Sequence, residues 1–134
     1  MSMGLPESHV INDPDEVPEF ALDQRELDER TQLIEVAGPV DLYVAPKLKE
    51  VLMGIIESGK RWIIIDLTGA TIVDSSVLGA LLSVRRRLQA RRGGLAVVCP
   101  QPRIRHVFEI TGLERMFPVE AGLDEALKAL RAAS

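Results

Sequence analysis

Cysteine and histidine are almost absent from this chain of 134 residues, and aromatic side chains are scarce. Cys99 is the only cysteine, so no internal disulfide can form and a reducing compartment is expected. One cysteine and two histidines do not supply the ligands of an ordinary zinc site. Aromatic residues make up 4% of the chain and hydrophobic residues 46%. We therefore expect one domain with an aliphatic core and no metal or cofactor.

The common catalytic and nucleotide-binding motifs are also missing. The chain contains no G-x-x-x-x-G-K-[ST] loop, no G-x-G-x-x-G fingerprint and no G-x-S-x-G elbow. His106 lies beside Arg103 and Arg105 in a predicted helix, and we interpret it as a solvated surface residue, not as a catalytic base. These absences favour a binding protein over an enzyme.

Neither a membrane span nor a basic excess is present. The most apolar stretch, residues 62–84, is interrupted by Asp66 and Asp74, whose carboxylates would be costly in lipid. The formal net charge is −4, and residues 1–30 hold nine acids against two arginines. No apolar signal segment opens the chain. We expect a cytoplasmic protein that binds neither membranes nor, directly, nucleic acid.

Hydrophobic patterning predicts alternating strands and helices after a polar leader. Residues 1–16 have no periodicity and are expected to form a disordered acidic tail, followed by one domain over residues 17–134. The predicted order is ββαβαβαβα, an α/β fold with a mixed sheet of about five strands and about four helices. Strands are expected near residues 20–22, 33–36, 62–67, 95–99 and 117–119, and helices from Pro46, Ser75, Pro102 and about Leu123.

One polar segment follows a predicted buried strand and opens a helix. It places Asp74, Ser75 and Ser76 at the helix start, where Asp and Ser commonly cap free amides. The alternative is functional, because a serine at an exposed helix start can be phosphorylated and the helix dipole tolerates the added charge. Composition alone leaves both interpretations open.

Two further features of this helix also allow two interpretations. Ser76, Gly79, Ala80 and Ser83 recur at helical spacing and are all small. They could pack against another helix of the domain or form a flat surface for a partner. The arginines at 85–87 are interpreted as a solvated helix face, with contact to phosphate or to an acidic partner as the alternative.

Several motifs, taken in order, resemble the STAS domains of anti-sigma factor antagonists. Gly38-Pro-Val-Asp41 resembles the family's G-E-L-D element. Residues 63–68 and 73–79 resemble its V-x-D-L-S and M-D-S-S-G-L-G elements, and residues 107–113 with 124–127 resemble its C-terminal half. The order and spacing of these motifs together indicate a single STAS-type domain. Val77 stands where the family usually has glycine.

The resemblance implies a phosphorylation switch. In the family, the serine after the motif aspartate is phosphorylated by an anti-sigma factor that is itself a serine kinase, and here that position is Ser75. The unphosphorylated form sequesters the kinase and so releases a sigma factor, and a PP2C-type phosphatase restores it. The predicted partner-binding residues are Asp41, Asp74, Ser76, Val77, Gly79, Ala80 and Ser83.

Two other functions remain as alternatives. A STAS domain can act as an unphosphorylated scaffold or subunit in a stress-signalling or transporter-associated complex. It can also sense a small ligand such as a nucleotide or lipid. A homodimer is compatible with each of these functions.

Overall fold

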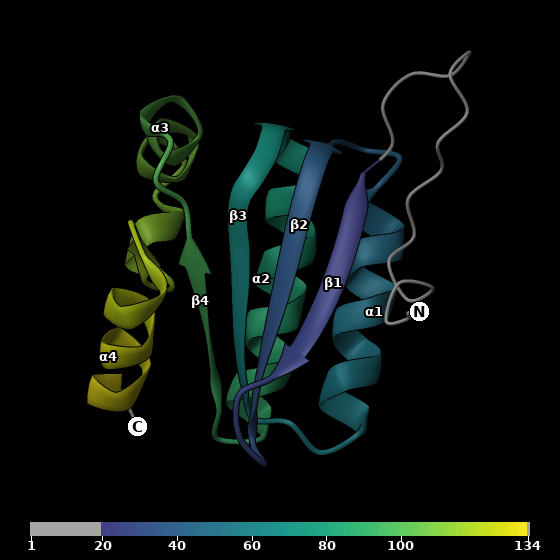
Figure 1. Cartoon of the computed structure of the whole chain (residues 1–134), viewed down its shortest axis with the longest axis vertical. Coiled ribbons are helices and arrows are strands. Elements are labelled where there is room, and N and C mark those ends of the chain that lie inside the picture. The colour runs from purple at the N-terminus through teal and green to yellow at the C-terminus, as the bar shows by residue number, and fades with distance from the viewer. Residues whose placement is uncertain (1–19, 134) are drawn as a thin grey trace.

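A single mixed sheet with helices on both faces forms the domain, as seen in the computed structural model (Figure 1). The model describes residues 20–133; the predicted tail, residues 1–16, and the first residues assigned to the domain, 17–19, lie outside the described residues. The elements are β1 Ala21–Glu26, β2 Thr31–Val40, α1 Ala45–Glu57, β3 Trp62–Val73, α2 Ser75–Ala90, β4 Gly94–Val98, α3 Pro102–Ile110, the 3-10 helix η2 Leu113–Arg115, β5 Val119–Glu120 and α4 Leu123–Ala133.

The strands are ordered β1-β2-β3-β4-β5 in the sheet. Among the described strands, only the β1–β2 pair is antiparallel, since a short turn joins those two strands. A helix connects each later strand to the next, which makes the other three pairs parallel. The predicted fold class and the order ββαβαβαβα are confirmed.

The β3 strand extends well beyond its predicted end. The apolar run suggested an end at Leu67, but pairing with β2 continues to Val73 through two register shifts. β4 ends at Val98, so it cannot pair with this extension. The side-chain amide of Gln101 donates instead to the carbonyls of Leu67, Thr68 and Ala70, at 2.9, 2.8 and 3.1 Å. A side chain thus replaces the missing neighbouring strand, and β3 reaches the start of α2.

Two hydrophobic clusters lie on opposite faces of the sheet. The larger one joins the sheet to α1 and α2, where Leu48, Leu52 and Leu81 are completely buried. Burying each such side chain contributes about 1.5–3 kcal/mol. The smaller cluster lies under α4 and contains Leu33, Ile64, Ala96, Val98, Ala126 and Leu130. Because both α1 and α2 are fixed against the sheet, their first turns have defined positions.

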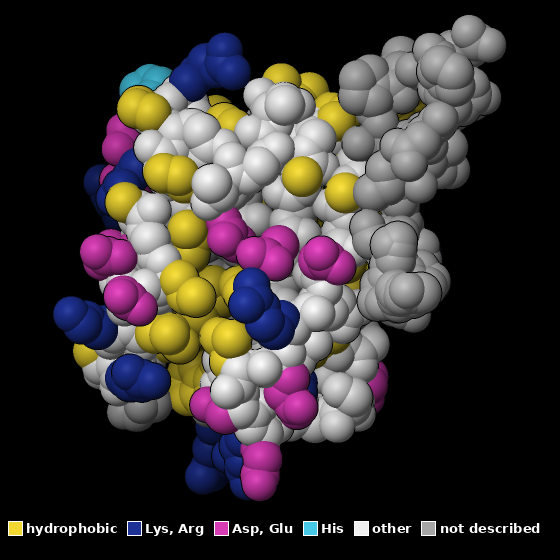
Figure 2. All heavy atoms as spheres, viewed as in Figure 1, with side chains coloured by type: hydrophobic (Ala, Val, Ile, Leu, Met, Phe, Trp, Pro, Cys, Tyr) yellow, Lys and Arg dark blue, Asp and Glu magenta, His cyan; other side chains and the backbone are white. Residues whose placement is uncertain are grey.

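The face that carries α4 is only partly covered by helix. Figure 2 shows acidic side chains crossing the uncovered strands of this face. Asp23 pairs with Glu35 across β1 and β2, and Glu35 pairs with Asp66 across β2 and β3. Arg25 offsets part of this charge, with its guanidinium 3.4 Å from a Glu35 carboxylate oxygen.

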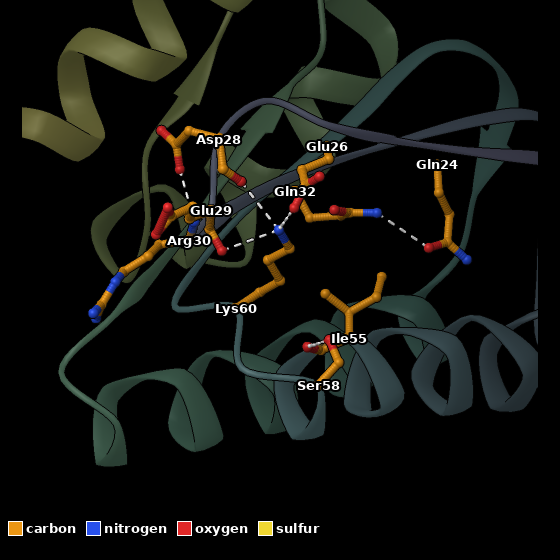
Figure 3. A network of polar contacts seen from close by, with 9 residues as sticks. All are labelled: Gln24, Glu26, Asp28, Glu29, Arg30, Gln32, Ile55, Ser58 and Lys60. Atoms are coloured by element: carbon orange, nitrogen blue, oxygen red, sulfur yellow. Dashed lines mark hydrogen bonds and ion pairs between the residues drawn. The ribbon is translucent and has the colours of Figure 1, made fainter.

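A lysine joins the β1–β2 turn to the start of β3 (Figure 3). The ammonium of Lys60 binds the Glu26 carboxylate and donates to the carbonyls of Asp28 and Glu29, at 3.0 and 3.1 Å. Its side chain is only 12% exposed. An ammonium has three protons, and here they meet three acceptors, so a nearly enclosed charge is fully compensated.

Candidate functional site

The predicted site residues come from two neighbouring strand ends. Val40, the last residue of β2, pairs with Val73, the last residue of β3. The Asp74 amide also donates to the Val40 carbonyl at 3.2 Å. Since parallel strands end at the same edge of a sheet, the segments that lead into α1 and α2 begin side by side.

Asp41 shapes the first of these two segments. Its carboxylate accepts hydrogen bonds from the amides of Tyr43 and Val44, at 3.0 and 3.2 Å. Val44, the N-cap residue of α1, makes no side-chain capping bond. The carboxylate therefore satisfies amides at the entry to α1 that the cap residue cannot reach.

Asp74 and Ser76 perform the capping at the start of α2. One Asp74 carboxylate oxygen accepts from the Ser76 amide at 3.0 Å and from the Ser76 hydroxyl at 2.9 Å. Ser75 is the first residue of α2, and its side chain is exposed. Within residues 20–133, no hydrogen bond engages the Ser75 hydroxyl. Asp74 and Ser76 therefore cap the helix, and the exposed Ser75 side chain takes no part in this cap.

A shallow hollow of about 390 Å³ lies between the amino-terminal parts of α1 and α2. All four small residues of the predicted stripe line it. Its lining residues are Leu42, Ala45, Pro46, Lys49, Ser76, Gly79, Ala80 and Ser83. We call this hollow the α1–α2 groove. It brings Ser76 together with Gly79, Ala80 and Ser83 on one surface next to Ser75.

Gly79 shows that packing within the domain does not explain the whole small-residue stripe. A Cβ atom added at Gly79 would meet nothing within 4 Å. Ala80, by contrast, is only 8% exposed and packs inside the domain. Glycine inside a helix costs about 1 kcal/mol relative to alanine. Within residues 20–133, no packing contact therefore requires a glycine at this position.

Val77 occupies a different place from the one predicted. Its side chain is 0% exposed and belongs to the larger core cluster with Leu81 and Val84. Residues at this helical spacing share one face, and that face of α2 points into the sheet. Val77 therefore offers no free surface to a partner, and we remove it from the binding set. Its side chain is also directed away from the solvent that Ser75 faces.

Sequence reasoning missed three exposed hydrophobic side chains near this edge. Leu42 and Tyr43, which lie between β2 and α1, are 54% and 83% exposed. Ile72, near the end of β3, is 50% exposed. The available signal was the position of Leu42 and Tyr43 directly after Asp41, where a short loop would ordinarily be polar. Leu42 lines the α1–α2 groove, and exposed apolar side chains next to a groove are typical of a protein interface.

Other candidates lie elsewhere. His106 is exposed and contacts Glu109 at 3.3 Å. Arg87 pairs with Glu57 of α1 at 2.7 Å, so the arginine cluster partly serves the contact between the two helices. Burial raises the pKa of the Cys99 thiol, which favours its protonated form.

The described part of the chain shows neither a metal site nor a membrane-spanning helix. No group of three His, Cys, Asp or Glu side chains there is arranged to hold a metal ion. No helix within residues 20–133 has the length and apolar character needed to cross a membrane.

The chain belongs to the STAS domain family, whose model matches residues 24–126. It is 32% identical over 91 residues to the anti-sigma-B factor antagonist of Staphylococcus aureus, covering 68% of this chain and 84% of that protein. The crystal structure of an anti-sigma factor antagonist from Mycobacterium paratuberculosis is similar with a TM-score of 0.76 and 26% identity, over 84% of this chain and 95% of that one.

A third similar protein is the Bacillus cell fate determinant SpoIIAA in its phosphorylated form. Its TM-score is 0.64 with 26% identity, over 81% of this chain and 97% of that one. The resemblance inferred from the motifs is therefore confirmed at the level of the family and the fold.

Proposed function

We propose that this chain is an anti-sigma factor antagonist whose binding is switched off by phosphorylation of Ser75. The observation that supports this proposal is the exposed Ser75 hydroxyl, which no described residue engages, beside a groove that leads onto α2. The similarity to named anti-sigma factor antagonists supports the class of function. The phosphorylated form of SpoIIAA supports the mode of control.

Electrostatics explain why a phosphate would spare the fold and weaken binding. Phosphorylation adds about −1.5 to −2 charges at neutral pH. The amino end of α2 offsets part of that charge, by about 0.3–1 kcal/mol at an exposed position. A partner packed over Ser75 would have to desolvate the phosphate beside the carboxylate of Asp74, with no such relief.

The proposed partner surface combines predicted and newly found residues. Asp41 and Asp74 set the backbone of its two entry segments, and Ser76, Gly79, Ala80 and Ser83 form its floor. Leu42, which lines the groove, and its neighbour Tyr43 add exposed apolar area. Apolar anchors around a small-residue floor favour a partner that inserts side chains into the groove.

The proposed partners follow from the family. An anti-sigma factor with serine kinase activity would bind the unphosphorylated chain and transfer phosphate to Ser75. The phosphorylated chain would then dissociate from the kinase. While bound, the kinase would release its sigma factor. A PP2C-type phosphatase would remove the phosphate, and the cycle would run in the cytoplasm.

Mass spectrometry of the phosphorylated chain tests the proposal. Trypsin cleavage after Arg61 and Arg85 places Ser75, Ser76 and Ser83 on one peptide, so fragmentation between the serines locates the phosphate. After incubation with the partner kinase and ATP, we expect phosphate on Ser75. Ser75→Ala should bind the kinase and stay bound in ATP.

The matched variants separate a switch from a passive surface. Ser75→Asp should fold normally and bind at least about tenfold more weakly, which corresponds to about 1.4 kcal/mol. Ser76→Ala is the control and should still be phosphorylated. Phosphate found only on Ser76, or unweakened binding by Ser75→Asp, would reject the phosphorylation switch. The scaffold function would then be favoured.

A further inference from the structure

A second hollow, of about 300 Å³, opens at the opposite end of the sheet from Ser75. It lies between the second half of α4 and the starts of β2 and β3. Its lining residues are Asp28, Arg30, Thr31, Trp62, Leu127, Leu130 and Arg131. The whole of β3 separates it from the start of α2, so this hollow is distinct from the α1–α2 groove.

Apolar side chains form one wall of the hollow. Trp62 and Leu127 are half-buried, and Leu130 is 5% exposed. Gly94 supports this wall: a Cβ atom there would lie 3.0 Å from the Trp62 ring and 3.6 Å from Leu130. Glycine therefore lets the indole lie close against β4. Figure 2 shows hydrophobic side chains gathered beside α4 on this face.

The opposite wall carries polar and charged groups. The Asp28 carboxylate is occupied by its own turn, accepting from the Arg30 amide at 2.8 Å, and this bond holds the pKa of Asp28 below its usual value. The Arg30 side chain is exposed and extends away from the Lys60 network (Figure 3). With Arg131 also on the lining, the hollow has two cationic side chains and one ionised carboxylate.

We propose that this hollow binds a small amphipathic carboxylate, with the apolar chain against Trp62 and Leu127 and the carboxylate paired with Arg30. A guanidinium fits a carboxylate through two parallel hydrogen bonds. The volume suits a ligand of roughly ten non-hydrogen atoms, since one water occupies about 30 Å³ in the liquid. Such pockets combine apolar walls with a few polar groups that fix the ligand's orientation.

Trp62 is the only tryptophan of the chain, so its fluorescence reports directly on this hollow. We would titrate the full chain with octanoate and follow the emission of Trp62 and its single indole N–H resonance. We expect a saturable change with half-saturation below about 1 mM. Octanol, which has a similar chain but no charge, should bind at least about fivefold more weakly.

Matched arginine variants decide the role of the charge. Arg30→Gln should weaken octanoate binding at least about fivefold and leave thermal unfolding unchanged. Arg61→Gln removes an exposed arginine that precedes the neighbouring strand and does not line this hollow, so its affinity should equal that of the wild type.

Any of the following results would overturn the proposal: no saturable change at Trp62, equal affinity for octanol and octanoate, or equal losses in the two arginine variants. Tighter binding of octylamine than of octanoate would also reject it, because Asp28 would then select the ligand. The test does not involve Ser75, so its outcome is independent of the phosphorylation switch.

Discussion

The carboxylate of Asp74 accepts hydrogen bonds from Ser76 and makes none with the neighbouring Ser75. A single oxygen of Asp74 accepts both the amide and the hydroxyl of Ser76, at 3.0 and 2.9 Å. Adjacent serines with the same chemistry thus have different surroundings: one completes the helix cap and the other faces solvent at the first position of α2. The cap of α2 therefore does not use the Ser75 hydroxyl.

The first prediction concerns this cap. Asp74→Ala removes both bonds to Ser76 and should lower the free energy of unfolding by about 0.5–2 kcal/mol. Asp74→Asn keeps an oxygen acceptor and should lose much less. Urea unfolding of the three proteins measures the difference. If Asp74→Ala were as stable as the wild type, the two hydrogen bonds would not contribute to the fold as described.

The second prediction uses two glycines with open surroundings. Gly79 in α2 and Gly54 in α1 would each accept a Cβ that meets nothing within 4 Å. Gly79→Ala and Gly54→Ala should therefore both raise the free energy of unfolding, by up to about 1 kcal/mol, through helix propensity. Thermal unfolding measures this gain.

The two variants should differ in partner binding. Gly79 lines the α1–α2 groove and Gly54 does not. Larger substitutions should enlarge the contrast, so that Gly79→Gln weakens binding of the partner kinase and Gly54→Gln leaves it unchanged in calorimetry. Equal affinities for these two variants would place the partner elsewhere.

The third prediction concerns Lys60, which holds the β1–β2 turn. Lys60→Met removes a nearly enclosed ammonium and leaves the Asp28 and Glu29 carbonyls without this donor. Since a hydrogen bond to a charged group contributes about 1.5–3 kcal/mol, the loss of unfolding free energy should be at least about 1.5 kcal/mol.

Glu26→Gln is the control for this prediction. It changes only the exposed acceptor of the same lysine and should cost clearly less. Denaturant unfolding compares the two variants. A greater loss from Glu26→Gln than from Lys60→Met would show that the exposed ion pair, and not the two carbonyl bonds, holds the turn.

The alternation of strands and helices could be predicted from the sequence because each element has its own hydrophobic period. The true end of β3 could not be predicted from the sequence, since it depends on a long-range contact. Gln101 lies 31–34 residues along the chain from the carbonyls it binds, and no local pattern indicates that pairing. Periodicity finds the buried part of a strand and stops where its side chains become exposed.

In the candidate site, too, features set by local sequence were predicted and features set by tertiary contacts were not. Asp74 and Ser76 were recognisable because capping depends on residues two positions apart. Val77 was included among the partner-binding residues because of the family motif, although its helical spacing with Leu81 and Val84 already predicted a buried face. Leu42 and Tyr43 were missed because their exposure depends on how α1 meets the sheet. Helix caps and buried helix faces could thus be predicted from the sequence, whereas the exposure of a loop between two elements requires the fold.

The last prediction concerns Glu57, which joins the end of α1 to α2. Its carboxylate oxygens contact Arg87 at 2.7 Å and Arg91 at 3.2 Å. Hydrogen bonds from Arg87 and then Arg91 hold the pKa of Glu57 below the usual glutamate value of 4.5. Because the folded state favours the ionised form, the stabilisation is fully present above that value and disappears as the pH falls through the lowered pKa.

Thermal unfolding across pH tests this linkage. At pH 7 the wild type should have a higher melting temperature than Glu57→Gln. This difference in melting temperature, the gap, should close as the pH falls below 4.5. About 0.5 M NaCl at pH 7 should also narrow the gap, because the pairs are exposed and the Debye length shortens with salt. Glu50→Gln is the control: its carboxylate on the same helix lies 3.9 Å from Lys47, so the gap at pH 7 should be smaller. A Glu57→Gln gap that widened in acid would mean that the neutral carboxyl is the stabilising form, contrary to the geometry of the two arginines.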